Sequence, residues 1–113
     1  KKSFKWGQII TGGEYNAYVG IVADEAENSN IDHQNAKIKF YDDTGLILEK
    51  PIVIKNRTAN VLEFPKILTS INGYPTNKPK SIWCVIEGEQ YGLNFFTATW
   101  NNNSNHCSGD HGF

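Results

Sequence analysis

The stretch AKIKFYDDTGLILEK, residues 36–50, decides the fold class because it has the pattern of two β-strands joined by a tight turn. Apolar residues alternate with lysines in AKIKF, which is typical of a strand with one buried face and one solvated face. The DDTG segment, residues 42–45, ends on glycine, as many β-turns do. We therefore predict an antiparallel hairpin here.

Alternation of period two continues on both sides of this hairpin. Upstream, every second residue of YNAYVGIVA is apolar, and Phe4, Trp6 and Ile10 share one parity nearer the N-terminus. Downstream, SIWCVIEG and YGLNFFTATW follow the same pattern, and we predict that they form a second hairpin with each other. Pro51 and Pro65 interrupt their segments, which indicates edge strands or bends.

These segments predict an all-β protein: a single antiparallel β-sandwich of about seven to eight strands. The 113 residues suffice for one domain, residues 1–113. Within it we expect an N-terminal strand or arm over 1–14. After the last strand we expect a closing tail over 101–113 that folds back on the sheet.

The composition excludes several classes of partner. The net charge is −1, with ten lysines and one arginine, whereas nucleic-acid binding favours a basic, arginine-rich face. No apolar run is long enough to span a membrane. The sequence contains no methionine, not even at position 1, which suggests a processed chain. We therefore expect a secreted or periplasmic protein.

The middle and late parts of the chain resemble a known family over residues 15–113. The order of motifs in NAKIKFYDDTGLILEKPIVIKNRTANVLEFPKIL, the paired strands of SIWCVIEGEQYGLNFFTATW and the terminal run SGDHGF carry the likeness. They are similar to the bacterial and archaeal β-sandwich family that includes the soluble transducer of a cyanobacterial sensory rhodopsin, and its secreted relatives. The resemblance implies a non-enzymatic interaction module, homo-oligomeric in the transducer, and it does not imply light sensing.

The two cysteines leave two alternatives open. Cys84 lies mid-strand in SIWCVI, and Cys107 lies in the tail beyond the last strand. A disulfide between them would pin the tail and stabilise the fold by about 3 kcal/mol in the chain-entropy model. Alternatively, Cys84 is a small buried hydrophobic residue, because it shares parity with Ile82 and Ile86.

The tail also contains residue types that bind metals. His106, Asp110 and His111 are the weak candidates, and Cys107 with the early Asp32 and His33 could complete a set. The spacing matches no paired zinc pattern, so we expect no metal and no cofactor. No nucleophile stands in a recognisable arrangement with a base and an acid, so we also expect no catalytic residue and no enzyme activity.

Aromatic residues make up 12% of the chain and suggest a binding surface. Flat rings stack against sugars in β-sandwich carbohydrate modules, and neighbouring amides bond the hydroxyl groups. The candidate binding residues are Trp83, Tyr91, Trp100, Asn101 and Asn102. Many aromatic residues simply fill cores. We therefore predict an interaction module that acts through protein contacts or self-association, with carbohydrate binding as the alternative and a metal-dependent enzyme as a distant third.

Overall fold

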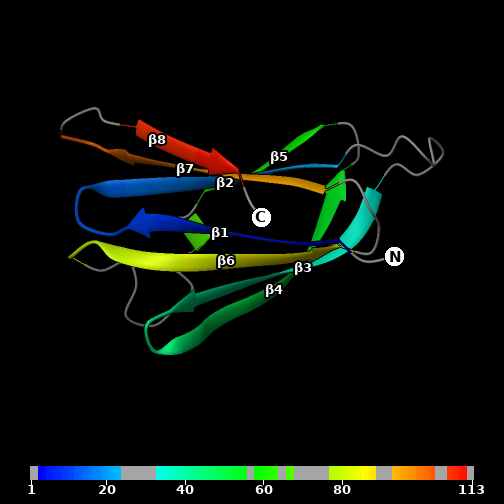
Figure 1. Cartoon of the computed structure of the whole chain (residues 1–113), viewed down its shortest axis with the longest axis horizontal. Coiled ribbons are helices and arrows are strands. Elements are labelled where there is room, and N and C mark those ends of the chain that lie inside the picture. The colour runs from blue at the N-terminus through cyan, green and yellow to red at the C-terminus, as the bar shows by residue number, and fades with distance from the viewer. Residues whose placement is uncertain are drawn as a thin grey trace.

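The structure of the chain is a computed structural model, and it describes residues 3–23, 33–55, 58–63, 66–67, 77–88, 93–103 and 107–111. The described residues form eight strands (Figure 1): β1 (Ser3–Thr11), β2 (Tyr15–Ala23), β3 (His33–Asp42), β4 (Gly45–Lys55), β5 (Ala59–Glu63), β6 (Lys80–Gly88), β7 (Leu93–Asn101) and β8 (Cys107–His111). The predicted all-β class is therefore confirmed.

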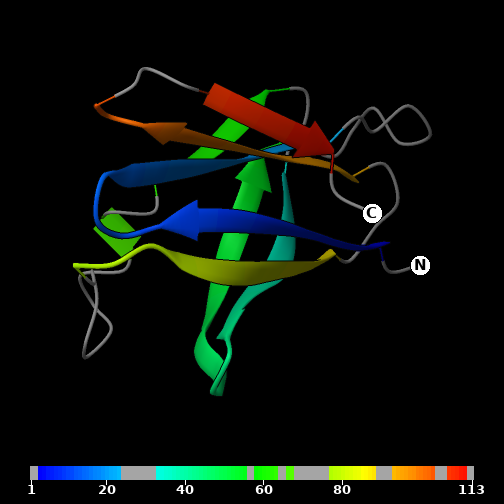
Figure 2. The same cartoon turned by 60° about the vertical axis from the view of Figure 1, so that its left-hand side comes forward.

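The strands build two packed sheets of four strands each. Sheet A has the order β1-β6-β3-β4, and sheet B has the order β5-β2-β7-β8. Every pairing within them is antiparallel. In Figure 1, β8 lies at the top of the view and β4 at the bottom, and in Figure 2 the β3–β4 hairpin runs steeply across the direction of β1 and β6. This is the antiparallel β-sandwich that the alternating pattern predicts.

The core consists of the inward-facing residues of both sheets. In β6 these are Ile82, Cys84 and Ile86, and in β7 they include Phe95. Fully burying one such side chain contributes about 1.5–3 kcal/mol. Among the described residues, the buried apolar set is Ile9, Ala17, Val19, Ile21, Ala23, Ala36, Ile38, Phe40, Ile54, Ile82, Cys84, Ile86, Leu93 and Phe95.

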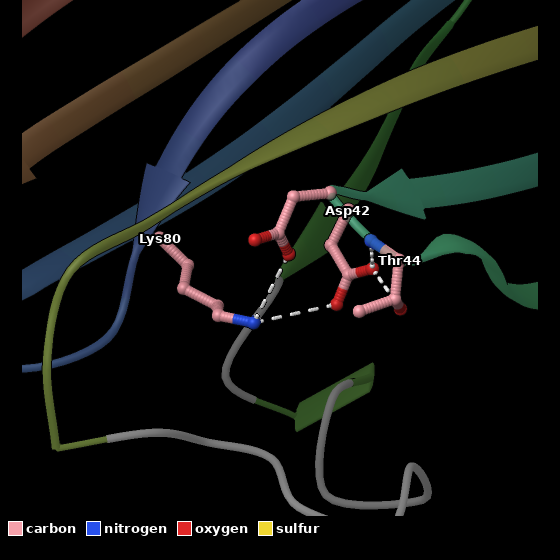
Figure 3. Close-up of polar contacts among 4 residues, drawn as sticks. Asp42, Thr44 and Lys80 are labelled. Atoms are coloured by element: carbon pink, nitrogen blue, oxygen red, sulfur yellow. Dashed lines mark hydrogen bonds and ion pairs between the residues drawn. The ribbon is translucent and has the colours of Figure 1, made fainter.

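The hairpin predicted from residues 36–50 is confirmed as β3 and β4, with a register shift between Phe40 and Tyr41. Its turn is held by Asp42, whose Oδ1 accepts a hydrogen bond of 2.8 Å from the Thr44 amide (Figure 3). Lys80 at the start of β6 places its Nζ 3.6 Å from the Asp42 carboxylate and 3.4 Å from that of Asp43. The turn is thereby attached to the neighbouring strand.

Two further expectations concern edges. Pro51 lies in β4, which pairs only with β3 among the described strands and is therefore an edge strand, as predicted. A proline is tolerated there because its missing N–H points away from the ladder. Pro65 itself lies outside the described residues, and the strand before it, β5, ends at Glu63 and is an edge strand of sheet B.

The predicted hairpin between SIWCVIEG and YGLNFFTATW is wrong. The first segment is β6, which pairs with β1 and β3, and the second is β7, which pairs with β2 and β8. Both strands carry an apolar inner face, and both faces belong to the one core between the sheets. Alternation alone cannot distinguish two strands side by side from two strands in opposite layers.

The N-terminal segment forms a full strand of sheet A. In β1 the buried residues are Gly7, Ile9 and Thr11, so the parity that holds Phe4, Trp6 and Ile10 faces outward. The free edge of β1 lies against sheet B, where the Ile10 amide donates a 3.4 Å hydrogen bond to Thr99 Oγ1 of β7. The end of the tail, residues 107–111, pairs with β7 as β8.

The close packing around Gly88, at the end of β6, leads to a prediction about stability. A Cβ at this position would lie 2.4 Å from Cδ1 of the buried Leu93. We expect Gly88→Ala to lower the free energy of unfolding by about 1–3 kcal/mol, because Leu93 cannot swing into solvent. Urea denaturation followed by tryptophan fluorescence measures this change.

A double-mutant cycle with Leu93→Ala gives the control. Leu93→Ala alone should cost about 2–5 kcal/mol. The double variant should lose less free energy of unfolding than the sum of the two single variants, because Leu93→Ala removes the side-chain atoms with which the new Cβ at position 88 clashes. Additive losses would contradict the packing of Gly88 against Leu93.

Candidate interaction surface

Large apolar side chains gather on the outer face of sheet A. Cross-strand register places Trp6 opposite Val85 and Gln8 opposite Trp83 on this face. Because the core takes the opposite parity of each strand, these side chains project into solvent. The apolar patch of sheet A is defined by its exposed members: Phe4, Trp6 and Ile10 of β1, Leu46 and Val53 of β4, and Trp83 of β6.

The centre of the apolar patch is a pair of tryptophans. The rings of Trp6 and Trp83 have centroids 5.3 Å apart and planes at 47°. Their exposed fractions are 38% and 40%, so more than a third of each side chain is available to a ligand. The two rings sit at diagonal positions on neighbouring strands, where aromatic side chains can reach one another.

Charged residues lie on the same outer face, among the apolar residues, and they neutralise one another. Lys39 lies 3.4 Å from Glu87 and 3.7 Å from Glu49, and Lys37 lies 4.0 Å from Glu49. The hydrogen bond and charge of Glu87 raise the pKa of Lys39, so Lys39 stays protonated at neutral pH. The two lysines and two glutamates leave this part of the face with no net charge.

The structure does not bring the predicted binding residues together. Trp83 is on β6 of sheet A, whereas Trp100 is on β7 of sheet B. Trp100 packs instead against Tyr18, with ring centroids 4.6 Å apart. Tyr91 lies outside the described residues. The two tryptophans therefore belong to different sheets and have different aromatic neighbours.

The asparagines after Trp100 are engaged in the turn that follows β7. Asn102 Oδ1 accepts hydrogen bonds from the Trp100 indole N–H at 2.9 Å and from the Asn16 side-chain amide at 3.1 Å. Asn101 Oδ1 accepts one from the Asn103 backbone N–H at 2.9 Å. These contacts support a local structural role for Asn101 and Asn102.

The disulfide between Cys84 and Cys107 does not form in the structure, where both thiols are free. Cys84 is buried on the inner face of sheet A, and Cys107 is exposed on β8, the outer edge strand of sheet B. The second alternative therefore holds: Cys84 packs as a small apolar residue between the layers. Burial raises the pKa of its thiol.

The weak metal candidates are not assembled in the described residues, where no three His, Cys, Asp or Glu side chains form a group able to hold a metal ion. Asp32 and His106 lie outside the described part of the chain. Asp110 and His111 belong to β8, and for these two residues only the backbone pairing with β7 is described. His33 is exposed at the start of β3, in the other sheet.

Sequence reasoning missed Trp6 as a partner of Trp83. The available signal was the shared parity of Phe4, Trp6 and Ile10, with Gly7 and Ile9 on the other parity. That pattern shows an unusually apolar outer face, but only the pairing of β1 with β6 joins the two tryptophans.

Comparison with known proteins bears on the fold alone. The chain is similar to Thermotoga maritima 1070, a protein of known crystal structure, with a TM-score of 0.63 and 19% identity over all of this chain and 92% of that one. No protein-family model and no curated protein matches, so the resemblance to the sensory rhodopsin transducer family stays a prediction. Within the described residues, no helix is long and apolar enough to cross a membrane.

The two free thiols should differ sharply in reactivity. In the native protein, a thiol reagent should modify the exposed Cys107 and leave Cys84 untouched, because burial excludes the reagent and disfavours the reactive thiolate. A colorimetric thiol count should therefore give one group in buffer and two in denaturant. One thiol or none in denaturant would instead reveal a disulfide or another modification.

Proposed function

We propose that this protein is a non-enzymatic interaction module that binds another protein through the outer face of sheet A. The observation that supports the proposal is the apolar patch of sheet A, which holds six of the eight large exposed apolar side chains of the described residues. Exposed apolar patches on small soluble domains commonly mark interaction sites.

The chemistry of the face indicates what kind of partner fits. Tryptophan is enriched among the residues that dominate binding energy at interfaces, and here two tryptophans lie in contact at the centre of the patch. The neighbouring Lys39 already forms ion pairs with Glu49 and Glu87. A partner with an apolar, uncharged contact surface would therefore bury this face without leaving an unpaired charge.

Paired substitutions on the two sheets test the proposal. A photo-crosslinking residue in place of the exposed Gln8, which lies opposite Trp83, would capture the partner from the source cell. Trp6→Ser combined with Trp83→Ser should weaken binding of that partner by about 30-fold or more, equivalent to about 2 kcal/mol.

The control is Val61→Ser combined with Phe96→Ser, which removes two exposed apolar residues from the outer face of sheet B. This variant should bind as the wild type does. Equal binding by both double variants, measured by titration calorimetry with the purified partner, would contradict the proposal.

Carbohydrate binding is the second candidate, and the Trp6–Trp83 pair is the observation that favours it. Two tilted, partly exposed rings 5.3 Å apart resemble the stacking platforms on which sugars bind. Addition of a matching glycan should change the tryptophan emission of the wild type and of the Val61→Ser/Phe96→Ser control. No response to any member of a broad glycan panel would remove this candidate.

Export remains part of the proposal. The gene sequence upstream of Lys1 tests this point: a cleavable signal peptide would support export, and its absence would count against it.

A further inference from the structure

The outer face of sheet A carries three rows of side chains that cross all four strands. β1, β6, β3 and β4 follow one another down the view of Figure 1, in the order of the sheet. Named in that order, the rows are Phe4, Glu87, Lys37 and Pro51; Trp6, Val85, Lys39 and Glu49; and Gln8, Trp83, Tyr41 and Leu46. The first two rows hold the lysines and glutamates that pair with one another. The third row contains no charged residue, and we refer to it as the uncharged row.

Two kinds of side chain alternate along the uncharged row. Gln8 is exposed, Tyr41 is half-buried, and both can donate hydrogen bonds from positions two strands apart. Trp83 and Leu46 offer apolar surface, with exposed fractions of 40% and 54%, and they also lie two strands apart. A ligand that fits this row needs apolar groups and hydrogen-bond acceptors that repeat with the same period.

The spacing of the strands sets that period. Neighbouring strands lie about 4.8 Å apart, so two strand spacings span about 9.6 Å. A polyproline II helix has about three residues per turn and advances about 3.1 Å per residue, so its residues i and i+3 lie on one side about 9.3 Å apart. An extended strand repeats every 6.7 Å or so, and an α-helix about every 5.4 Å. Of the three, only the polyproline II repeat matches the row.

The chemistry of a proline-rich segment also matches the row. A polyproline II helix has no internal hydrogen bonds, so its carbonyl oxygens are available to donors on a partner. Proline is apolar, and proline-rich segments bind to exposed aromatic side chains. Because Lys37 and Lys39 are already paired with glutamates, a neutral segment leaves no charge of this face without its partner.

Binding by addition of a strand to sheet A is opposed at both of its edges. At the β1 edge, the Ile10 amide donates its hydrogen to Thr99 Oγ1 of sheet B. The other edge strand, β4, contains Pro51, which has no backbone N–H to donate. A partner of sheet A therefore binds to the face of the sheet and not along its edge.

We propose that the partner contacts the uncharged row with a proline-rich segment in the polyproline II conformation, which lies across the strands of sheet A. Prolines at positions i and i+3 of this segment rest on Trp83 and Leu46. The Tyr41 hydroxyl and the Gln8 side-chain amide donate hydrogen bonds to carbonyl oxygens of the segment. The Trp6 ring, 5.3 Å from that of Trp83, adds a second apolar surface beside the first contact.

This inference rests on the proposed function, because it specifies which kind of protein segment binds the outer face of sheet A. A polyproline II helix is already extended and stiff before binding, so it loses little conformational entropy when it binds. A short segment can therefore bind without a deep groove.

Fluorescence anisotropy of a labelled decaproline peptide tests the contact. The wild type should bind decaproline and should not bind a glycine–serine peptide of equal length. Tyr41→Phe should weaken the binding of decaproline about fivefold, because it removes one hydrogen-bond donor and keeps the ring. Tyr18→Phe, the matched substitution on sheet B, should bind as the wild type does. Trp83→Ser should weaken the binding about tenfold or more.

The spacing of the prolines tests the period. We compare two ten-residue alanine peptides that each contain three prolines, placed at every third position in one and at every second position in the other. The second peptide never places prolines at i and i+3. It should bind about fivefold more weakly, because one apolar contact is lost. An excess of decaproline should also displace the partner that was captured at position 8.

Several results would overturn this inference: no binding of decaproline, equal effects of Tyr41→Phe and Tyr18→Phe, equal binding of the two alanine peptides, or a captured partner that decaproline does not displace. The proposed function survives each of these results if the captured partner still requires Trp6 and Trp83. A glycan that binds the wild type when decaproline does not would assign the uncharged row to carbohydrate binding and would likewise overturn the inference.

Discussion

The burial of the inner faces of sheet A and sheet B in one shared core is the constraint on which the rest of the structure depends. Ile82, Cys84 and Ile86 of sheet A and Phe95 of sheet B are all buried in this core. In the structure the two strands that carry them, β6 and β7, lie in different layers, and both contribute to the same core. The layer assignment in turn fixes which residues of every neighbouring strand face outward, because side chains alternate between the two faces.

The functional consequence is a molecule with two different outer faces. Sheet A presents Trp6 and Trp83 in contact, next to lysines and glutamates that neutralise one another. Sheet B presents the stacked Tyr18 and Trp100, with Trp100 fixed by a hydrogen bond to Asn102. The first arrangement leaves two tryptophans exposed for a partner, whereas in the second the indole N–H of Trp100 is already bonded within the protein.

Local pattern predicted much of the fold from sequence. Alternation and the DDTG turn were sufficient for β3 and β4, because a short hairpin depends on neighbouring residues. The pairing of β6 with β1 was not predictable in this way, since the paired residues, such as Gln8 and Trp83, lie far apart in the chain. The candidate site was predicted less well than the fold. Trp83 was identified from the sequence, but it was grouped with Trp100 because the two residues are close in the chain. Its neighbour in the structure is Trp6, and that contact can be found only when the strand order of the sheet is known.

The most direct test of this account is a map of cross-strand proton contacts by nuclear magnetic resonance. The account predicts backbone contacts from β6 to β1 and β3, including Trp83 with Gln8, and from β7 to β2 and β8. Backbone contacts that pair β6 directly with β7 as a hairpin would contradict it. Such contacts would place Trp83 and Trp100 in one sheet, and the outer faces of sheet A and sheet B would then no longer be separate surfaces.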